Sequence, residues 1–153
     1  MTKAPDAKTR FSTELRSLLT IVMAAVLLSA KPGYADSHYA DLVAEGRDAL
    51  KGNEYDVAIA RFTSAILLDP RKVEAWGERA EAYAVKGDRA RAQADCAQGL
   101  NLAPNSSEAH RRCGFVSYHA RNYQRAIADV NTALRLDHRN ALAYADRGAS
   151  YLS

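Results

Sequence analysis

The sequence of 153 residues has few of the residues that mark disulfide-rich, β-sheet or disordered proteins. It contains two cysteines, four prolines and one tryptophan. After its N-terminal part it shows no alternating run of Val, Ile and Thr that would predict strands. A hydrophobic content of 48% excludes wholesale disorder. Alanine and leucine dominate the last three quarters of the chain, which favours helix. The sequence therefore predicts an all-α protein with a single domain.

Motifs of catalysis and metal binding are also missing. The chain has no glycine-rich phosphate loop, no nucleophile elbow and no zinc-protease helix. His110 and Cys113 lie three residues apart, but the closely paired ligand spacing that is typical of zinc sites is absent. We therefore expect no enzyme activity, no metal and no cofactor.

The N-terminal segment has the pattern of an export signal. Basic residues precede an uncharged apolar run of 13 residues from Leu18 to Ala30, and the small residues Gly33 and Ala35 follow it. A membrane span needs about 20 apolar residues, so the run is short for a span. The pattern predicts a secretory signal peptide, residues 1–35, and a periplasmic or secreted protein. Two alternatives remain open, a buried core helix and an uncleaved membrane anchor.

The net charge of the chain depends on this segment. Residues 1–35 hold five basic and two acidic side chains, whereas residues 36–153 hold 16 of each. The formal charge of +3 therefore belongs to the N-terminal segment. No basic footprint for nucleic acid remains on the rest of the chain. We expect no nucleic-acid partner, and a membrane partner only if the N-terminal segment is retained.

The domain that we assign to residues 36–153 repeats itself every 34 residues. The stretches "AILLDP" from Ala65, "GLNLAP" from Gly99 and "ALRLDH" from Ala133 recur at that interval. The interval divides the domain into repeats 39–72, 73–106 and 107–140 and a partial repeat or capping helix, 141–153. A period of this length is the signature of a repeat array, in which neighbouring units bury a shared core.

The positions that recur within each unit carry a resemblance to a known family. Small residues occupy the eighth, twentieth and twenty-seventh positions, and the clearest motifs are "WGERAEAY" from Trp76 and "YDVAIARFTSAILLDP" from Tyr55. This pattern resembles the tetratricopeptide-repeat (TPR) family. The resemblance implies an α-solenoid of antiparallel helix pairs in a right-handed superhelix, with three full repeats plus one extra C-terminal helix.

The ends of the helices are also expected to repeat. We expect Gly52 and Gly87 to take the left-handed conformation that ends the first helix of a pair, with Asn122 as the substitute in the third unit. Pro70 and Pro104 stop the second helix of their units. His138 lacks the constraint of proline, so we expect the third helix end to be less sharply set.

The resemblance implies that the first helix of each unit lines a concave groove. Arginine binds carboxylates well, and aromatic rings offer an anchor surface, so this face is expected to bind a peptide or helix of a protein partner. The alternative is that the charges pair with one another across adjacent helices. The candidate groove residues are Arg47, Lys51, Glu74, Glu78, Glu81, Arg111, Arg112, Phe115, Tyr118 and His119.

The best-known ligands of the family are the acidic C-terminal tails of chaperones. The clamp for these tails requires basic and amide residues at defined positions. Val43, Arg47 and Glu78 occupy three of these positions, Glu108 replaces a further basic group, and Arg112 alone is a good match. We therefore do not expect this ligand.

The two cysteines leave two possibilities. Cys96 and Cys113 fall on consecutive helices that should pack together. They form either a disulfide, which an oxidising compartment would permit, or two small buried thiols.

These inferences predict a non-enzymatic protein–protein interaction module, a scaffold or adaptor in an exported complex. A second hypothesis is structural: the domain is one end of a larger helical-repeat assembly and self-associates through 141–153. A third is a TPR protein anchored to a membrane by an uncleaved N-terminal segment.

Overall fold

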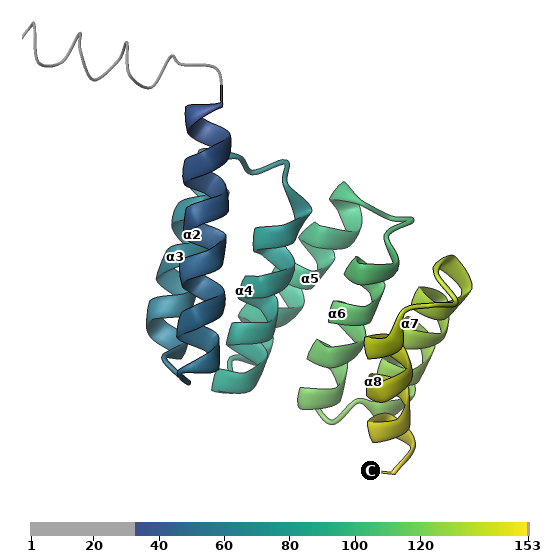
Figure 1. Cartoon of the computed structure of the whole chain (residues 1–153). Coiled ribbons are helices and arrows are strands. Elements are labelled where there is room, and N and C mark those ends of the chain that lie inside the picture. Colours follow the sequence, from purple (N-terminus) through teal and green to yellow (C-terminus); the bar gives the residue numbers. More distant parts are fainter. Residues whose placement is uncertain (1–32, 153) are drawn as a thin grey trace, which may run out of the picture. The chain divides into compact units, whose positions relative to one another are not determined.

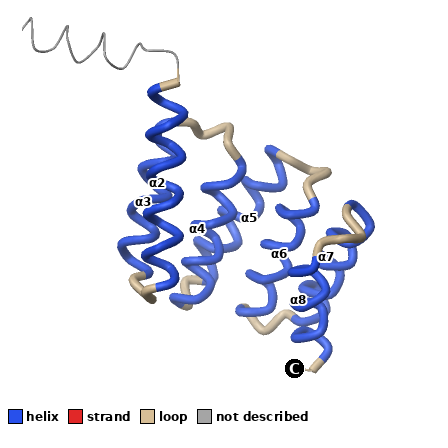
Figure 2. Tube along the Cα trace, viewed as in Figure 1, coloured by secondary structure: helices blue, strands red, loops and turns tan. Residues whose placement is uncertain are grey.

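The computed structural model describes residues 33–152, and within them it contains seven helices and no strand (Figure 1, Figure 2). The predicted all-α fold class is therefore confirmed. The helices are α2 (Tyr34–Lys51), α3 (Tyr55–Leu68), α4 (Val73–Lys86), α5 (Arg89–Leu102), α6 (Ser107–His119), α7 (Tyr123–Leu136) and α8 (Ala141–Tyr151).

The chain divides into two compact units, Met1–His38 and Tyr39–Ser153. In the first unit, the described residues form the opening turns of α2. The predicted signal peptide or anchor, 1–35, lies outside the described residues except for its last three positions. Among the residues that the structure describes, no helix is both long and apolar enough to cross a membrane.

The second unit is an array of helix pairs in which the paired backbones come close. Gly46 of α2 faces Phe62 of α3, and a Cβ atom on this glycine would lie 2.5 Å from the phenyl ring. A Cβ atom on Gly114 of α6 would lie 2.5 Å from a methyl carbon of Val130 of α7. The middle pair has alanine at this position, opposite the smaller Cys96. The residue sizes therefore match across each pair, as a close-packed interior requires.

The apolar core is shared between successive pairs. One cluster joins Val43 and Phe62 of the first pair to Ala75 of α4, and a second joins Tyr83 of α4 to Val116 of α6. A third cluster covers α7 with α8. Figure 1 shows the pairs stacked side by side in chain order. No pair buries its apolar face alone, so the stacking itself creates the core.

The first helix of each pair ends at the same position of the unit. The left-handed residues are Asn53 (φ 59°), Gly87 (φ 90°) and Arg121 (φ 61°). The prediction for Gly87 is confirmed, but those for Gly52 and Asn122 are wrong. Asn122 instead accepts a hydrogen bond from an N–H in the first turn of α7 and so caps that helix. The register of the array fixes where the chain must turn, and the side chain at that point adapts to it.

The second helices of the first and third pairs both end with an extended residue, so the predicted difference between these two helix ends is absent. Asp69 and Asp137 have φ, ψ values of −144°, 96° and −142°, 100°. The third helix end is thus set as sharply as the first, although His138 replaces proline. The cause is the aspartate, because each carboxylate accepts a backbone N–H two residues on, from Arg71 at 3.0 Å and from Arg139 at 2.9 Å.

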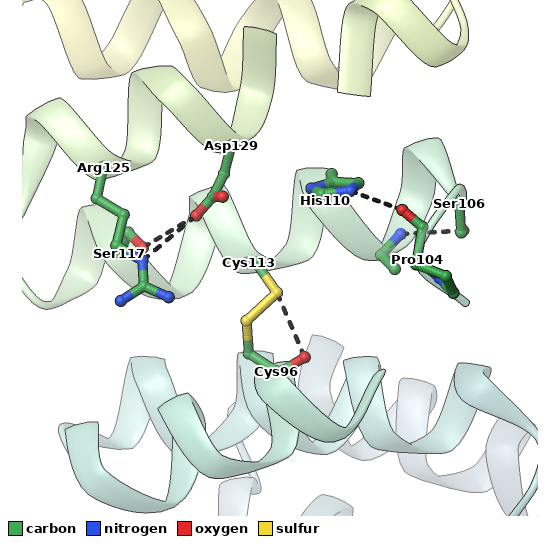
Figure 3. Close-up of a disulfide and its surroundings, with 9 residues drawn as sticks. Cys96, Pro104, Ser106, His110, Cys113, Ser117, Arg125 and Asp129 are labelled. Carbon is green, nitrogen blue, oxygen red and sulfur yellow. Dashed lines mark hydrogen bonds and ion pairs between the residues drawn. A yellow bond between two sulfur atoms is a disulfide. The ribbon is translucent and has the colours of Figure 1, made fainter. Parts of the chain in front are cut away.

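A side-chain hydrogen bond ties each connection to the helix that follows it. Trp76 Nε1 donates to the carbonyl of Pro70 at 2.9 Å, and Tyr144 donates to the carbonyl of His138 at 3.3 Å. His110 Nε2 makes the corresponding bond to the carbonyl of Pro104 at 3.0 Å (Figure 3). Three different side chains at the fourth position of the unit therefore fix the angle at which successive pairs meet.

Two glycines allow a test of the close approach between paired helices. A Cβ atom on Gly148 of α8 would meet nothing within 4 Å, unlike one on Gly114. We expect Gly148→Ala to raise the free energy of unfolding by about 0.5–1 kcal/mol through helix propensity. We expect Gly114→Ala to lower it by about 1–3 kcal/mol because the methyl group overpacks the contact. Urea unfolding followed by circular dichroism would measure both, and stabilisation by both substitutions would contradict this packing.

Candidate functional site

A continuous network of ion pairs runs along the first helices of the pairs. Arg47 of α2 lies 2.6 Å from Glu74 and 2.8 Å from Glu78, both on α4. Arg112 of α6 lies 2.8 Å from the same Glu78. A single carboxylate therefore joins three helices of three successive repeats.

Arg111 forms a second centre in this network. Its guanidinium lies 2.7 Å from Glu81 of α4, 2.9 Å from Glu108 of its own helix and 3.0 Å from Asp146 of α8. Arg112 approaches two of the same carboxylates, Glu81 at 3.2 Å and Glu108 at 2.8 Å. The alternative interpretation of the sequence, that the charges pair with one another across adjacent helices, therefore describes these side chains well. We call Arg47, Glu74, Glu78, Glu81, Glu108, Arg111, Arg112 and Asp146 the ionic wall.

The ionic wall contains three guanidinium groups and five carboxylates, so acidic groups are in excess. Burial raises the pKa of Glu81, although the two arginines oppose this. Burial alone would also raise the pKa of Glu108, but hydrogen bonds and charges from Arg111 and Arg112 lower it. The pKa of Arg111 is raised above its ordinary value because its carboxylate partners outweigh its burial.

The members of the ionic wall differ in their access to a ligand. Glu78 is 4% exposed and Arg111 is 6% exposed, so both are committed to the interior. The side chains of Arg47 and Glu74 are 45% exposed, and that of Glu108 is 46% exposed. Exposed carboxylates at the second position of repeats two and three are therefore the groups that can receive a cationic ligand.

The predicted aromatic residues gather at the end of α6. The ring centroids of Phe115 and His119 lie 4.3 Å apart, and those of Tyr118 and His119 lie 5.6 Å apart. Burial lowers the pKa of His119. A small cavity of about 120 Å³ opens beside Phe115 and Tyr118, against Asp146 of α8. The aromatic residues and the ionic wall are therefore adjacent on α6.

One of the ten candidate residues lies apart from the others. Lys51 pairs at 2.8 Å with Asp48 of its own helix, and both side chains are exposed. The structure also adds Glu108 and Asp146, which the candidate set omits. Their signal is present in the sequence, since Glu108 stands 34 residues after Glu74 in the same register.

A larger cavity of about 320 Å³ lies between α4, α5 and α6, next to the ionic wall. Arg47, Glu74, Glu108 and Arg112 line its charged side. Sequence reasoning misses this feature, although two helical glycines in one interface are a weak signal for it. The small and apolar residues that line it are Val73, Gly77, Cys96, Gly99, Ala109 and Cys113.

A disulfide forms part of the wall of this cavity. Cys96 of α5 and Cys113 of α6 are bonded, with Cα atoms 5.4 Å apart and a separation of 17 positions in sequence (Figure 3). A bridge that closes a loop of this length stabilises a fold by about 3 kcal/mol in the chain-entropy model. It fixes α5 against α6, so repeats two and three are covalently joined beside the cavity.

Cys113 stands at a position where the neighbouring repeats have arginine. In repeat two, Arg79 makes two hydrogen bonds to Asp95, at 2.7 and 2.8 Å. The corresponding Asp129 lacks such a partner and has Arg125 at 3.7 Å and the hydroxyl of Ser117 at 3.5 Å (Figure 3). Burial accordingly raises its pKa. The exchange of arginine for cysteine thus replaces a buried ion pair with the disulfide.

Among residues 33–152, no group of three His, Cys, Asp or Glu side chains is placed to hold a metal ion. Cys113, which lies three residues after His110, is in the disulfide. His110 uses one ring nitrogen for the carbonyl of Pro104.

Comparison with known proteins gives relatives that match part of the chain. The human Protein SGT1 homolog is 31% identical over 90 residues, 59% of this chain and 25% of that protein. The Hsp70-Hsp90 organizing protein of Triticum aestivum is 26% identical over 108 residues, 70% of this chain and 19% of that protein. The match thus spans a quarter or less of the length of these two relatives. No protein-family model matches the chain.

Solved structures agree with the predicted fold class. The Sgt2 TPR domain from Aspergillus fumigatus matches with a TM-score of 0.67 and 22% identity, over 74% of this chain and 77% of that one. The first TPR of Spaghetti (RPAP3), bound to the HSP90 peptide SRMEEVD, matches with a TM-score of 0.65 and 24% identity, over 76% and 92%. The chain therefore has the TPR helical-repeat fold.

The predicted periplasmic or secreted location is wrong. The prediction depended on the composition of residues 1–35, in which a short apolar run follows basic residues. The repeats instead resemble proteins named for SGT1 and for the organization of Hsp70 and Hsp90, and this relationship contradicts an exported protein. An apolar run of this kind is a pattern of composition and does not establish export by itself.

The contribution of the ionic wall to stability can be tested at its buried arginine, Arg111. Arg111→Gln removes the guanidinium that Glu81, Glu108 and Asp146 share, so we expect a loss of about 3–5 kcal/mol in the free energy of unfolding. The control is Arg61→Gln, which breaks the exposed pair with Glu45 and should cost about 0–1 kcal/mol. Thermal and urea unfolding of both variants would measure the difference. Equal losses of unfolding free energy in the two variants would show that the ionic wall stabilises the fold no more than an exposed ion pair does.

Proposed function

We propose that residues 39–152 form a protein-interaction module that binds a peptide segment of its partner along α2, α4, α6 and α8. In this proposal the repeats are 39–72, 73–106 and 107–140, and 141–153 serves as a partial repeat that caps the last one. The observation that carries the proposal is the ionic wall, whose exposed carboxylates lie beside a cavity of about 320 Å³. Such a combination of an apolar hollow and a few placed polar groups is typical of binding sites.

Similar proteins support a peptide as the ligand. The first TPR of Spaghetti (RPAP3) is bound to the HSP90 peptide SRMEEVD, and the second TPR domain of human RPAP3 is in complex with the HSP70 peptide SGPTIEEVD. These peptides belong to those proteins. For this chain they support the class of ligand, a short segment of another protein.

The charges of the ionic wall favour a different peptide from these acidic ones. Arg47 has two carboxylate partners, while Arg111 and Arg112 have three each. An acidic tail would have to displace these partners and would then face the excess of carboxylates. The exposed faces of Glu74 and Glu108 are better suited to a ligand that brings positive charge.

A pair of matched photo-crosslinkers tests where a peptide binds. Val85 on α4 is 39% exposed and Val57 on α3 is 43% exposed, so the two sites are equally accessible. A photo-reactive benzoylphenylalanine would replace each valine in turn in the full chain. Peptides selected from a random displayed library should crosslink at position 85 and not at position 57. Equal labelling at both positions, or failure to select any peptide, would contradict the proposal.

A second candidate function is self-association through α8. The favouring observation is the apolar surface of this helix, on which Leu142 and Tyr151 are 62% and 65% exposed. Sedimentation velocity over a wide range of concentration separates the two candidates. The peptide-binding module predicts a monomer at every concentration. Association that rises with concentration and disappears in Leu142→Ser/Tyr151→Ser would favour self-association instead.

A further inference from the structure

We propose that the cavity between α4, α5 and α6 is a pocket for one aromatic side chain of an extended peptide that also carries basic residues two positions away. This inference rests on the proposed peptide-binding function and names the chemistry of the ligand. It goes beyond that function, because a peptide could bind the ionic wall without entering the cavity.

The cavity owes part of its volume to Gly99 of α5, which lines the hollow and presents no side chain. Gly77 of α4 also lines it, but Arg112 occupies the space beside this glycine, since a Cβ atom there would lie 2.4 Å from its Cδ. A Cβ atom on Gly99 would lie 3.6 Å from Val73, in ordinary contact and without any clash. The interface would therefore accept a side chain at position 99. Because glycine has none, the space stays open. At about 320 Å³, the hollow is at the lower end of ligand pockets and suits a single ring.

The walls of the cavity favour an aromatic group. Val73, Ala109 and the disulfide of Cys96 and Cys113 supply apolar and sulfur surface. Sulfur makes favourable contacts with aromatic rings at distances of about 5 Å. Because the disulfide joins α5 to α6, the hollow cannot close simply by a shift of one helix against the other. A preformed pocket of this kind costs little to occupy.

The charged side of the cavity favours basic neighbours of that ring. Glu74 and Glu108 both line the cavity and have nearly half of their side-chain surface exposed. Arg47 and Arg112 line the same side, but the side chain of Arg112 is only 12% exposed, so two carboxylates and one guanidinium remain accessible there. A cation from the ligand would therefore meet more accessible negative than positive charge at the pocket.

The spacing of the ligand follows from the geometry of an extended chain. Successive side chains point to opposite sides, so residues two apart point to the same side, about 6.6 Å apart. A ring that enters the pocket thus places the side chains two positions before and after it against the same wall. The pattern is basic–x–aromatic–x–basic, which GSKGFGKSG represents as a probe peptide.

Three synthetic peptides test this pattern on the full chain labelled with nitrogen-15. We expect GSKGFGKSG to shift the amide signals of Gly77, Gly99 and Ala109. We expect GSKGAGKSG to bind at least about tenfold more weakly, because the methyl group buries much less apolar area than the ring. The acidic analogue GSEGFGESG should bind more weakly still. Equal binding of the phenylalanine and alanine peptides would overturn the pocket.

Substitutions inside the cavity provide the matched protein controls. Gly99→Leu places a side chain in the hollow and should weaken binding of GSKGFGKSG by at least about tenfold. Gly148→Leu introduces the same side chain on α8, where nothing lies within 4 Å of the Cβ position, and should leave binding unchanged. Binding of GSKGFGKSG to a folded Gly99→Leu variant with wild-type affinity would contradict the proposal.

Substitutions at the charged side do not depend on the stability of Gly99→Leu. The double substitution Glu74→Gln/Glu108→Gln should weaken the binding of GSKGFGKSG by about tenfold. It should have little effect on the binding of an uncharged GSGGFGGSG peptide. The control Glu45→Gln removes an exposed carboxylate that pairs with Arg61 on α3 and should change neither. An equal loss for both peptides in the double variant would overturn the role of the carboxylates.

The outcomes separate the pocket from the underlying function. If library-selected peptides crosslink at position 85 while the alanine and phenylalanine probes bind alike, the pocket is wrong and the peptide-binding module stands. If no peptide crosslinks at position 85, both the peptide-binding module and the pocket are wrong.

Discussion

The close approach of the two helices in each repeat is the constraint on which the rest of this fold depends. Gly46 against Phe62 and Gly114 against Val130 leave no room for a Cβ atom, and in the middle repeat alanine is matched by the smaller Cys96. With the pairs held this closely, their outer faces stack and bury a core that runs from one repeat to the next. The first helices then lie next to one another, and this brings the charges of three repeats and α8 within hydrogen-bonding distance.

The ionic wall that results is a structural element, and in the proposed function it is also part of the binding surface. Its buried members, Glu78 and Arg111, fix the relative positions of successive repeats, while the exposed Glu74 and Glu108 keep free surface beside the cavity between α4, α5 and α6. Buried and hydrogen-bonded charges are costly to rearrange, so the wall is rigid where it holds the array together. The excess of carboxylates gives the face a definite sign. In the proposed function, the same face would discriminate against acidic peptides and favour basic ones.

The period, the helix pairs and the positions of close contact could be predicted from the sequence, because small residues and helix-ending residues recur every 34 positions. How the charges pair could not be predicted, because the same arginines and glutamates could bind either a ligand or one another. Only the distances between the helices decide between these two arrangements. The cavity could not be predicted for a related reason. The sequence does not show whether a neighbouring side chain fills the space beside a helical glycine such as Gly99. The turns show a third limit, because Arg121 takes the left-handed conformation through the register of the array, although arginine has no preference for it.

In the proposed complex, a partner peptide binds along the first helices of the repeats and inserts an aromatic ring between α4, α5 and α6. The most direct measurement is a crystal structure of the full chain with the peptide GSKGFGKSG. We expect the phenyl ring between Val73 and the disulfide, with a lysine ammonium group at Glu74 or Glu108. A ring bound on the surface formed by α3, α5 and α7, with the cavity empty, would contradict it.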